Sequence, residues 1–523
     1  MAAGTVALLS SCNDYLEIYP ENVQPTDEYW NSKEEVDATL MAGYYYLREA
    51  VEDYLIPWGE LRAGCVSSRS SSSLQNFELK PTDKVVTWAP MYKIINAANL
   101  VLKNAGKALE NDDTYSQSEL NSHHCEAYWL RALAYFYIVR NWRDAPLITE
   151  PFETDELTFN VPKSSEASII AQIKSDLRTA IQLDAAKEKF NSTWETKGRA
   201  TKWAILALMT DVCMWNQDFD EAITYADAII NSGSTAAPRF MSTPTHSSWF
   251  SMFNPGNSNE SIFEIQWAYE KLSKGTPQTN NLTTMFQRTA NSEPRYEYST
   301  EMLDNFRNDY RTLREKYGMQ FEQELAGRTY YGSFETEQQN PDNYENASRA
   351  FVWKYYGGTS YNTQRLSLQD YDCNYILYRV ADIMLLKAEA LVMRKGGQDT
   401  DDNQKAVDII NQMRRRTNLD ESLDVNSHSS LSVLIQKGIL HERLMELAGE
   451  GKAWYDMLRM ARYKDPAGQL DFKALFINNV VTYNRTKESW KRSALSNENA
   501  WYLPVSASEI SANDLLEQNP YYL

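Results

Sequence analysis

The sequence predicts a mostly α-helical protein in which helical hairpins form a scaffold around an irregular, loop-rich lobe with short strands. Two observations support this fold class. Long apolar stretches that cover nearly every side of a helix occur in both halves of the chain. The residues between those halves are instead rich in Gly, Asn, Pro and Thr, which interrupt regular structure.

Three apolar stretches are predicted to be buried helices. The first is EAYWLRALAYFYIVRNWRDAPLI at Glu126–Ile148, and we expect Pro146 to end it because proline cannot continue a helix. The second and third are Tyr375–Val392 and Leu440–Arg459. Since none of the three has a polar face wide enough for a surface position, we expect all of them inside the protein.

Shorter amphipathic segments predict the helices around this core. Apolar residues recur at helical spacing in Ser32–Glu49, Trp88–Leu102 and residues 169–181. Arg199–Asn216 and Glu221–Asn231 form a predicted hairpin with small residues at the contact, and a similar pair follows at residues 380–393 and 404–416. Pairs of this kind are typical of degenerate tetratricopeptide repeats, which stack into a superhelix.

Residues 236–371 differ from the helical parts on either side. Ser261–Trp267 (SIFEIQW) alternates like a strand, and the remainder is predicted to be loop. Thirteen of the 33 tyrosines fall between residues 290 and 380, so we place the functional surface in this lobe. After the second helical part, the tail is predicted to close with a short helix at Asn513–Gln518.

The predicted organisation is one compact body with four segments. These are a lipoprotein signal remnant at 1–12, an N-terminal helical part at 13–235, the irregular lobe at 236–371, and a C-terminal helical part with its tail at 372–523.

Composition excludes several classes of partner. The net charge of -19, the pI near 4.9 and the lack of a Lys/Arg run oppose nucleic acid or an anionic lipid surface. The cysteines show no CxxC pair, so neither a zinc knuckle nor a disulfide framework is expected. Four of them are predicted to be small buried hydrophobic residues, namely Cys65, Cys125, Cys213 and Cys373.

Catalytic motifs are also missing from the sequence. His441-Glu442 resembles half of a zinc-binding helix, but Met445 occupies the position of the second histidine. No phosphate-binding glycine loop and no GxSxG motif occurs, so we expect no cofactor, no metal and no enzyme. Glycoside hydrolysis stays a minor hypothesis, because sequence cannot show the separation of two carboxylates. A dense charged set is interpreted as structural ion pairs: Glu442, Arg443, Glu446, Glu450, Lys452, Asp456 and Arg459.

The first residues resemble the end of a lipoprotein signal. Ala2–Leu9 is apolar, and LSSC at Leu9–Cys12 matches the lipobox, in which cleavage leaves an acylated cysteine. We therefore predict Cys12 as the lipid anchor. No Lys or Arg precedes Lys33, so the basic start of a complete signal peptide is lacking.

These motifs together resemble the SusD/RagB family of outer-membrane nutrient-binding lipoproteins. The resemblance is carried by EAYWLRALAYFYIVRNWRDAPL, RVADIMLLKAEAL, HERLMELAGEGKAWYDMLR and YLPVSASEISANDLLEQNPYY, in the family's order along the chain. It implies a lipid-anchored protein exposed at the surface of the outer membrane. Such a protein captures glycan for polysaccharide utilisation and passes it to a SusC-like TonB-dependent transporter, on which it sits as a lid.

Sugar binding requires aromatic faces for the C–H side of the ring and polar side chains for the hydroxyls. The resemblance implies that the loop before the second helix, here Glu60–Val86, and the loops of the irregular lobe supply them. Gly64 stands where the family often has an acidic residue, so no contact is inferred there. The predicted site combines hydrogen-bonding groups on Arg69 and Asn76 with stacking platforms on Tyr296, Tyr331 and Trp353.

A second hypothesis is a role in protein interaction. Tetratricopeptide-like grooves favour a scaffold or lid for the transporter that binds peptide, or nothing tightly, whereas the tyrosine-rich lobe favours glycan.

Overall fold

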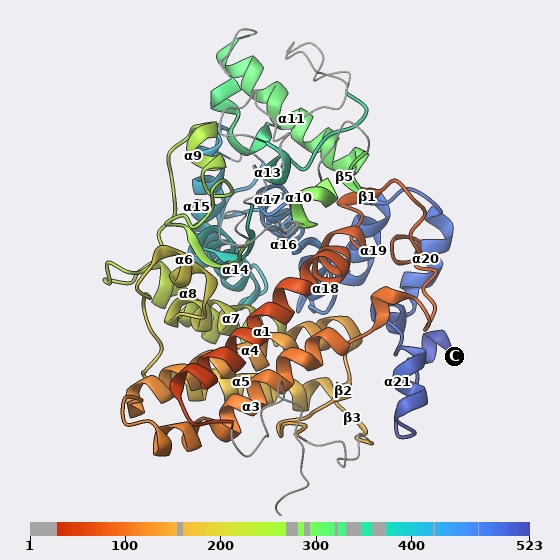
Figure 1. The fold of residues 1–523 in the computed structure, drawn as a ribbon. Coiled ribbons are helices and arrows are strands. Elements are labelled where there is room, and N and C mark those ends of the chain that lie inside the picture. The colour runs from red at the N-terminus through yellow and green to blue at the C-terminus, as the bar shows by residue number, and fades with distance from the viewer. Residues whose placement is uncertain are drawn as a thin grey trace, which may run out of the picture.

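The computed structural model describes residues 29–153, 160–267, 281–286, 293–318, 323–330, 347–357, 373–421, 424–468 and 470–523. It confirms the predicted mostly helical fold (Figure 1). Long helices form the lower part of the molecule in this view, the irregular lobe lies above them, and C-terminal helices cover the right-hand side.

The scaffold is a series of helices in which each contacts the next. These helices are α1 (Lys33–Ala50), α3 (Ala89–Asn111), α4 (Gln117–Trp142), α5 (Glu166–Gln182), α7 (Lys202–Trp215), α8 (Phe219–Ile230), α14 (Val380–Met393) and α15 (Thr400–Arg416). Contacts run from α1 to α3, α4, α5, α7 and α8, then to α14 and α15, although α8 and α14 are far apart in sequence. This stack is the predicted tetratricopeptide-like superhelix.

Helix α4 lies at the centre of the scaffold. Ser116 caps its start, since its side chain accepts a hydrogen bond from the Glu119 N–H while Glu119 bonds back to the Ser116 N–H. Every residue from Trp129 to Trp142 is buried, which confirms the predicted central helix. The helix ends before Pro146, because Arg143 adopts a left-handed φ of 68° and the chain enters a short strand.

Three two-stranded antiparallel sheets connect distant segments. Strand β1 (Val66–Ser68) pairs with β5 (Tyr296–Tyr298), β2 (Ala145–Pro146) with β3 (Lys163–Ser164), and β4 (Ser261–Ile265) with β6 (Tyr375–Arg379). The predicted strand at Ser261–Trp267 is therefore present, and it ends two residues early.

Shorter elements complete the described fold. The α-helices are α2 (Ser73–Asn76), α6 (Thr193–Gly198), α9 (His246–Phe250), α10 (Asn281–Phe286), α11 (Thr300–Tyr317), α13 (Trp353–Tyr356), α16 (Leu431–Val433), α17 (His441–Glu446), α18 (Ala453–Ala461), α19 (Phe472–Tyr483), α20 (Glu488–Ser496) and α21 (Ala507–Ala512). Wider π-helical turns occur at Val51–Leu55, Pro57–Leu61 and Leu434–Leu440, and 3-10 turns at Lys84–Val86, Gln323–Thr329, Glu498–Trp501 and Pro520–Tyr522.

The structure corrects three predicted helices. Tyr375–Val392 starts as strand β6 and becomes helical only at Val380, because its aromatic and β-branched start pairs with β4. Leu440–Arg459 is interrupted after α17, where Gly449 and Gly451 have left-handed φ angles of 79° and 73°. The closing helix is α21, not Asn513–Gln518, since Asn513 already has an extended φ of -141°.

The charged set between α17 and α18 belongs to a buried ionic core, which confirms the structural interpretation. Arg379 reaches Glu260, Glu446 and Glu450 at 2.9, 2.7 and 2.9 Å. Arg416 contacts Glu260 and Glu446 at 2.5 Å each. These side chains are at most 1% exposed and join the strands of the lobe to the scaffold helices.

Cys65, Cys125, Cys213 and Cys373 are all buried, as expected of small hydrophobic residues. Within the described ranges, every helix is too short or too polar to cross a lipid bilayer.

Candidate functional site

The structure joins the two regions in which the sequence places the site. Strand β1, at the start of the serine-rich loop, pairs with β5 of the irregular lobe, so that Ser68 lies opposite Tyr296. Just beyond the strand, Arg69 Nη1 lies 2.8 Å from Glu293 Oε2. The loop and the lobe therefore share one surface.

Helix α20 holds the loop after β1 from the other side (Figure 1). Asn484 Nδ2 donates to the Gln75 carbonyl at 2.6 Å, and Trp490 Nε1 donates to the Asn76 carbonyl at 3.1 Å. Phe77 follows with a left-handed φ of 57° and is buried against Trp454 at a ring separation of 5.9 Å. Two hydrogen bonds and one apolar contact thus hold this turn of the N-terminal part against the C-terminal part.

The turn before α20 is fixed from within. Lys491 is buried, and its Nζ donates to the Asn484 carbonyl at 3.1 Å and to Thr486 Oγ1 at 3.0 Å. Burial, with a contribution from the nearby Lys487, lowers the pKa of Lys491 to about 8. The Lys491 side chain therefore ties α20 to the turn that precedes it and so fixes the direction of the helix.

Trp490 has the geometry of a sugar-stacking platform. Its side chain is 45% exposed, although its N–H is bonded to Asn76. A ring that is fixed at one edge and open to solvent can receive the C–H face of a sugar without losing much conformational freedom. The Asn76 side chain beside it donates only to exposed Ser71 Oγ, at 3.3 Å.

A small polar pocket adjoins the same loop. It encloses about 280 Å³ and is lined by serine hydroxyls together with charged side chains and one aromatic ring: Ser68, Ser70, Ser71, Ser72, Ser73, Asp53, Asp83, Lys84, Arg295 and Tyr296. Asp83 Oδ2 accepts hydrogen bonds from Ser73 Oγ at 2.8 Å and from the Lys80 N–H at 3.1 Å. We call this the serine pocket, and its hydroxyl-rich wall is suited to a polyhydroxylated ligand.

Of the five predicted binding residues, Arg69 is exposed and Asn76 is partly exposed. Asn76 stands beside Trp490, and Arg69 is bonded to Glu293. Tyr296 and Trp353 are instead only 2% and 3% exposed, so neither offers an open ring face in this structure. Tyr331, like the predicted anchor Cys12, lies outside the described residues.

The two buried rings belong to the core of the lobe. Tyr296 packs on Phe286 at a centroid distance of 6.0 Å, and Trp353 packs on Tyr330 at 4.9 Å. Their packing explains why they are poor platforms, although the edge of Tyr296 still reaches the serine pocket. The sequence reasoning missed Trp490, whose signal was a tryptophan among polar neighbours in KESWKRS.

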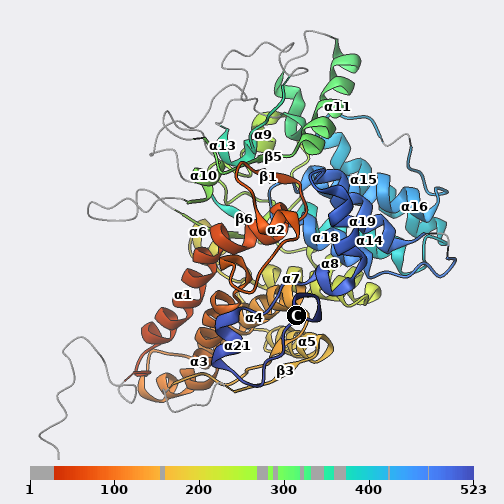
Figure 2. The same cartoon turned by 90° about the vertical axis from the view of Figure 1, so that its right-hand side faces the viewer.

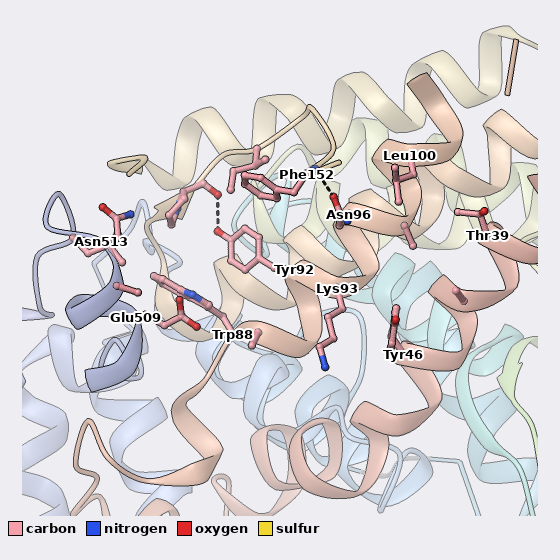
Figure 3. Close-up of a pocket in the computed structure, with 17 residues that line it drawn as sticks. Thr39, Tyr46, Trp88, Tyr92, Lys93, Asn96, Leu100, Phe152, Glu509 and Asn513 are labelled. Carbon is pink, nitrogen blue, oxygen red and sulfur yellow. Dashed lines mark hydrogen bonds between the residues drawn. The ribbon is translucent and has the colours of Figure 1, made fainter. Parts of the chain in front are cut away.

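A second and larger cavity lies on the scaffold (Figure 3). It encloses about 480 Å³ along α3, between α1 and the segment after β2, and α21 closes one end. Its lining is mostly apolar. Two polar groups in it are already bonded, since Tyr92 donates to the Pro146 carbonyl at 2.6 Å and Asn96 Oδ1 accepts the Phe152 N–H at 2.8 Å. This groove suits apolar side chains better than sugar hydroxyls.

Figure 2 shows α2 and β1 on the face of the molecule that lies toward the viewer, with β5 behind them and α18 beside them. Within the described ranges, no group of three or more His, Cys, Asp or Glu side chains has the arrangement of a metal site. The described residues of this face therefore offer a ring face, amides and hydroxyls, which are groups for binding by stacking and hydrogen bonds.

Two family models match the chain. One is described as the SusD family and matches residues 214–522, and the other is described as starch-binding associating with outer membrane and matches residues 14–214. SusD-like protein P38 of Formosa agariphila is 25% identical over 510 residues, covering 89% of this chain and 92% of that protein. A SusD-like protein of Bacteroides ovatus is 24% identical over 495 residues, covering 88% of this chain and 82% of that protein.

Solved structures share the fold. The crystal structure of a SusD superfamily protein from Bacteroides thetaiotaomicron superposes with a TM-score of 0.69 at 24% identity, covering 94% of this chain and 99% of the other. A laminarin-binding SusD-like protein superposes with a TM-score of 0.66 at 21% identity, also covering 94% and 99%.

Proposed function

The chain belongs to the SusD family, and from that premise we propose that it is a non-catalytic glycan-binding lipoprotein of the outer-membrane surface. In this proposal Cys12 carries the lipid anchor, and the bound oligo- or polysaccharide is delivered to a SusC-like TonB-dependent transporter. The family description, starch-binding associating with outer membrane, and the relative that binds laminarin support the choice of glycan.

The observation that carries the proposal is the half-exposed Trp490 held against the loop after β1. Its indole would stack on one sugar ring, while the Asn76 amide and the serine hydroxyls would bond to hydroxyls of the same or the next ring. Arg69 would lie at the margin of this site. Trp490 takes the role that the sequence suggested for Tyr296 and Trp353, and Tyr331 stays a predicted platform.

Affinity gel electrophoresis with a panel of plant, host-mucin and microbial polysaccharides tests the proposal. We expect Trp490→Ala to weaken binding by about tenfold, because an aromatic face contributes roughly 0.5–1.5 kcal/mol beyond the area it buries. Trp490→Phe should retain part of the affinity. The matched control is Trp194→Ala on α6, since Trp194 is 42% exposed.

If Trp490→Ala migrates like the Trp194→Ala control in every gel, the platform assignment is wrong. A separate incubation of the pure protein with each retarding polymer should release no product, and release of oligosaccharides would instead indicate a glycoside hydrolase.

The apolar groove of Figure 3 favours the second function, docking of a protein such as the transporter. Ala42 lies in its wall on α1, so Ala42→Arg would place a long charged side chain there. Loss of transporter co-purification with glycan binding intact would support docking at this groove. Unchanged co-purification would exclude it.

A further inference from the structure

Most of the positive charges on the surface that carries Trp490 are neutralised locally. We call residues 66–86, 293–298 and 484–492 the loop face. Five of its cations each lie close to a carboxylate: Arg69 to Glu293 at 2.8 Å, Lys84 to Asp53 at 2.6 Å, Lys487 to Glu78 at 2.6 Å, Arg492 to Glu488 at 3.0 Å and Arg295 to Glu52 at 3.6 Å. A sixth, Arg485, contacts Glu301.

These pairs surround the ring and the pocket. Lys487 is the N-cap residue of α20, three positions before Trp490, and its partner Glu78 follows directly after Asn76 and Phe77. Lys84 and Arg295 line the serine pocket, while Arg69 leaves β1 at its edge. Among the described residues, exposed Lys80 and buried Lys491 have no such ion pair. Every other cation that a ligand meets on this face already has an acidic neighbour.

From this arrangement we infer that the ligand is a neutral polysaccharide, and that the ion pairs of the loop face exclude uronate and sulfated polymers. The inference rests on the proposed function of the same site. A polyanion needs cations that can neutralise it. At six of the cations here a new pair would require separation of an existing one, so little electrostatic free energy is gained at those positions.

The net charge of the chain also disfavours binding of an anionic polysaccharide. The chain carries a formal charge of -19, which repels a polyanion during its approach. Neutral hydroxyls meet no such barrier, since the Asn76 amide and the serine hydroxyls can donate to and accept from them without a counter-ion. Affinity for a neutral polymer should therefore depend only weakly on salt.

The first test compares neutral glucans, including laminarin and starch, with polygalacturonate and a sulfated polymer in affinity gels. We expect retardation by at least one neutral polymer and by neither anionic one. Titration calorimetry with the retarding polymer should give Kd values within about twofold at about 50 and 500 mM NaCl. Retardation by an anionic polymer alone would overturn the inference and leave glycan binding standing, whereas no retardation in any gel would count against the proposed function and the inference together.

The second test removes the neutralising groups. Glu78→Gln/Glu293→Gln leaves Lys487 and Arg69 without these carboxylates, so we expect the double variant to gain retardation in polygalacturonate. The control Glu34→Gln/Glu221→Gln changes net charge equally, on α1 and α8, away from the loop face (Figure 1). If the two double variants migrate alike, the ion pairs do not exclude anions. Thermal melts of both variants establish that they are folded.

Discussion

Glu60 is a buried carboxylate whose ionisation should oppose folding. It lies in the π-helical turn Pro57–Leu61, is 1% exposed, and accepts backbone hydrogen bonds through Oε1 from Gly451 at 2.8 Å and Lys452 at 3.2 Å. Its other oxygen, Oε2, has no hydrogen-bond partner in the described part of the chain. Burial raises the pKa of Glu60 to about 7, more than the two N–H donors lower it.

The sign and size of the effect on stability follow from this shift. An unfolded glutamate has a pKa of about 4.3, so between that pH and 7 the folded state binds more protons than the unfolded state. Stability from this residue is therefore complete below about pH 4 and is lost as pH rises through 7. The rise of the pKa from about 4.3 in the unfolded chain to about 7 in the folded protein corresponds to about 3–4 kcal/mol.

Glu60→Gln removes the charge and keeps the Oε1 acceptor, so it resembles the protonated carboxyl. We expect the variant to be more stable than the wild type by about 1 kcal/mol at about pH 5 and by roughly 3–4 kcal/mol at about pH 8.5. Urea unfolding at several pH values measures this difference, in which the contributions of all other titrating groups cancel.

The exposed Glu34 on α1 provides the control, and Glu34→Gln should leave the free energy of unfolding within about 0.5 kcal/mol of wild type at each pH. If the curves for Glu60→Gln and wild type stay parallel from about pH 5 to 8.5, Glu60 titrates normally and the reasoning is refuted.

Four further substitutions should alter stability, each measured by urea unfolding. A Cβ on Gly59 would lie 2.1 Å from the Gly451 carbonyl oxygen, so Gly59→Ala should be strongly destabilising. A Cβ on Gly106 in α3 would meet nothing within 4 Å, so Gly106→Ala should stabilise the protein by about 0.5–1 kcal/mol. Equal effects of the two substitutions would contradict this reasoning. Arg379→Met leaves three buried carboxylates without their shared partner and should cost about 3–5 kcal/mol; a loss under about 1 kcal/mol would show that the pairs are not needed. Ser116→Ala removes the cap of α4 and should cost about 1 kcal/mol, and no change would mean that the cap is dispensable.

The sequence predicted the scaffold well because its helices have strong local signals. The hairpin α7 and α8 follows from apolar spacing and small contact residues. Helix α1, predicted over Ser32–Glu49, spans Lys33–Ala50, and Ser32 caps its start. Strand β6 was missed for a physical reason. A short apolar segment that is buried on both faces has the same composition as a buried helix, and only its pairing with the distant β4 decides between them.

The candidate site was predicted less completely. Sequence reasoning chose the loop that pairs with the lobe and named Asn76 on it, and both stay predictions. An excess of tyrosine does not tell an exposed ring from a packed one. In this lobe the rings of Tyr296 and Trp353 are part of the buried core and pack on Phe286 and Tyr330. Trp490 contacts a loop more than 400 residues away in sequence, so no local pattern could place it there.

The position of Trp490 also explains why the loop face needs its ion pairs. The loop comes from the N-terminal part and α20 from the C-terminal part, and the described bonds between them near the ring are few. Exposed pairs such as Lys487 with Glu78 contribute little stability individually, at about 0–1 kcal/mol. Their greater effect is on recognition, because a cation that already has a carboxylate beside it cannot attract an anionic chain. The contacts between the loop and α20 can therefore both orient the Trp490 ring and neutralise nearby cations. Hydrogen bonds to sugar hydroxyls then remain as the basis for selecting the ligand.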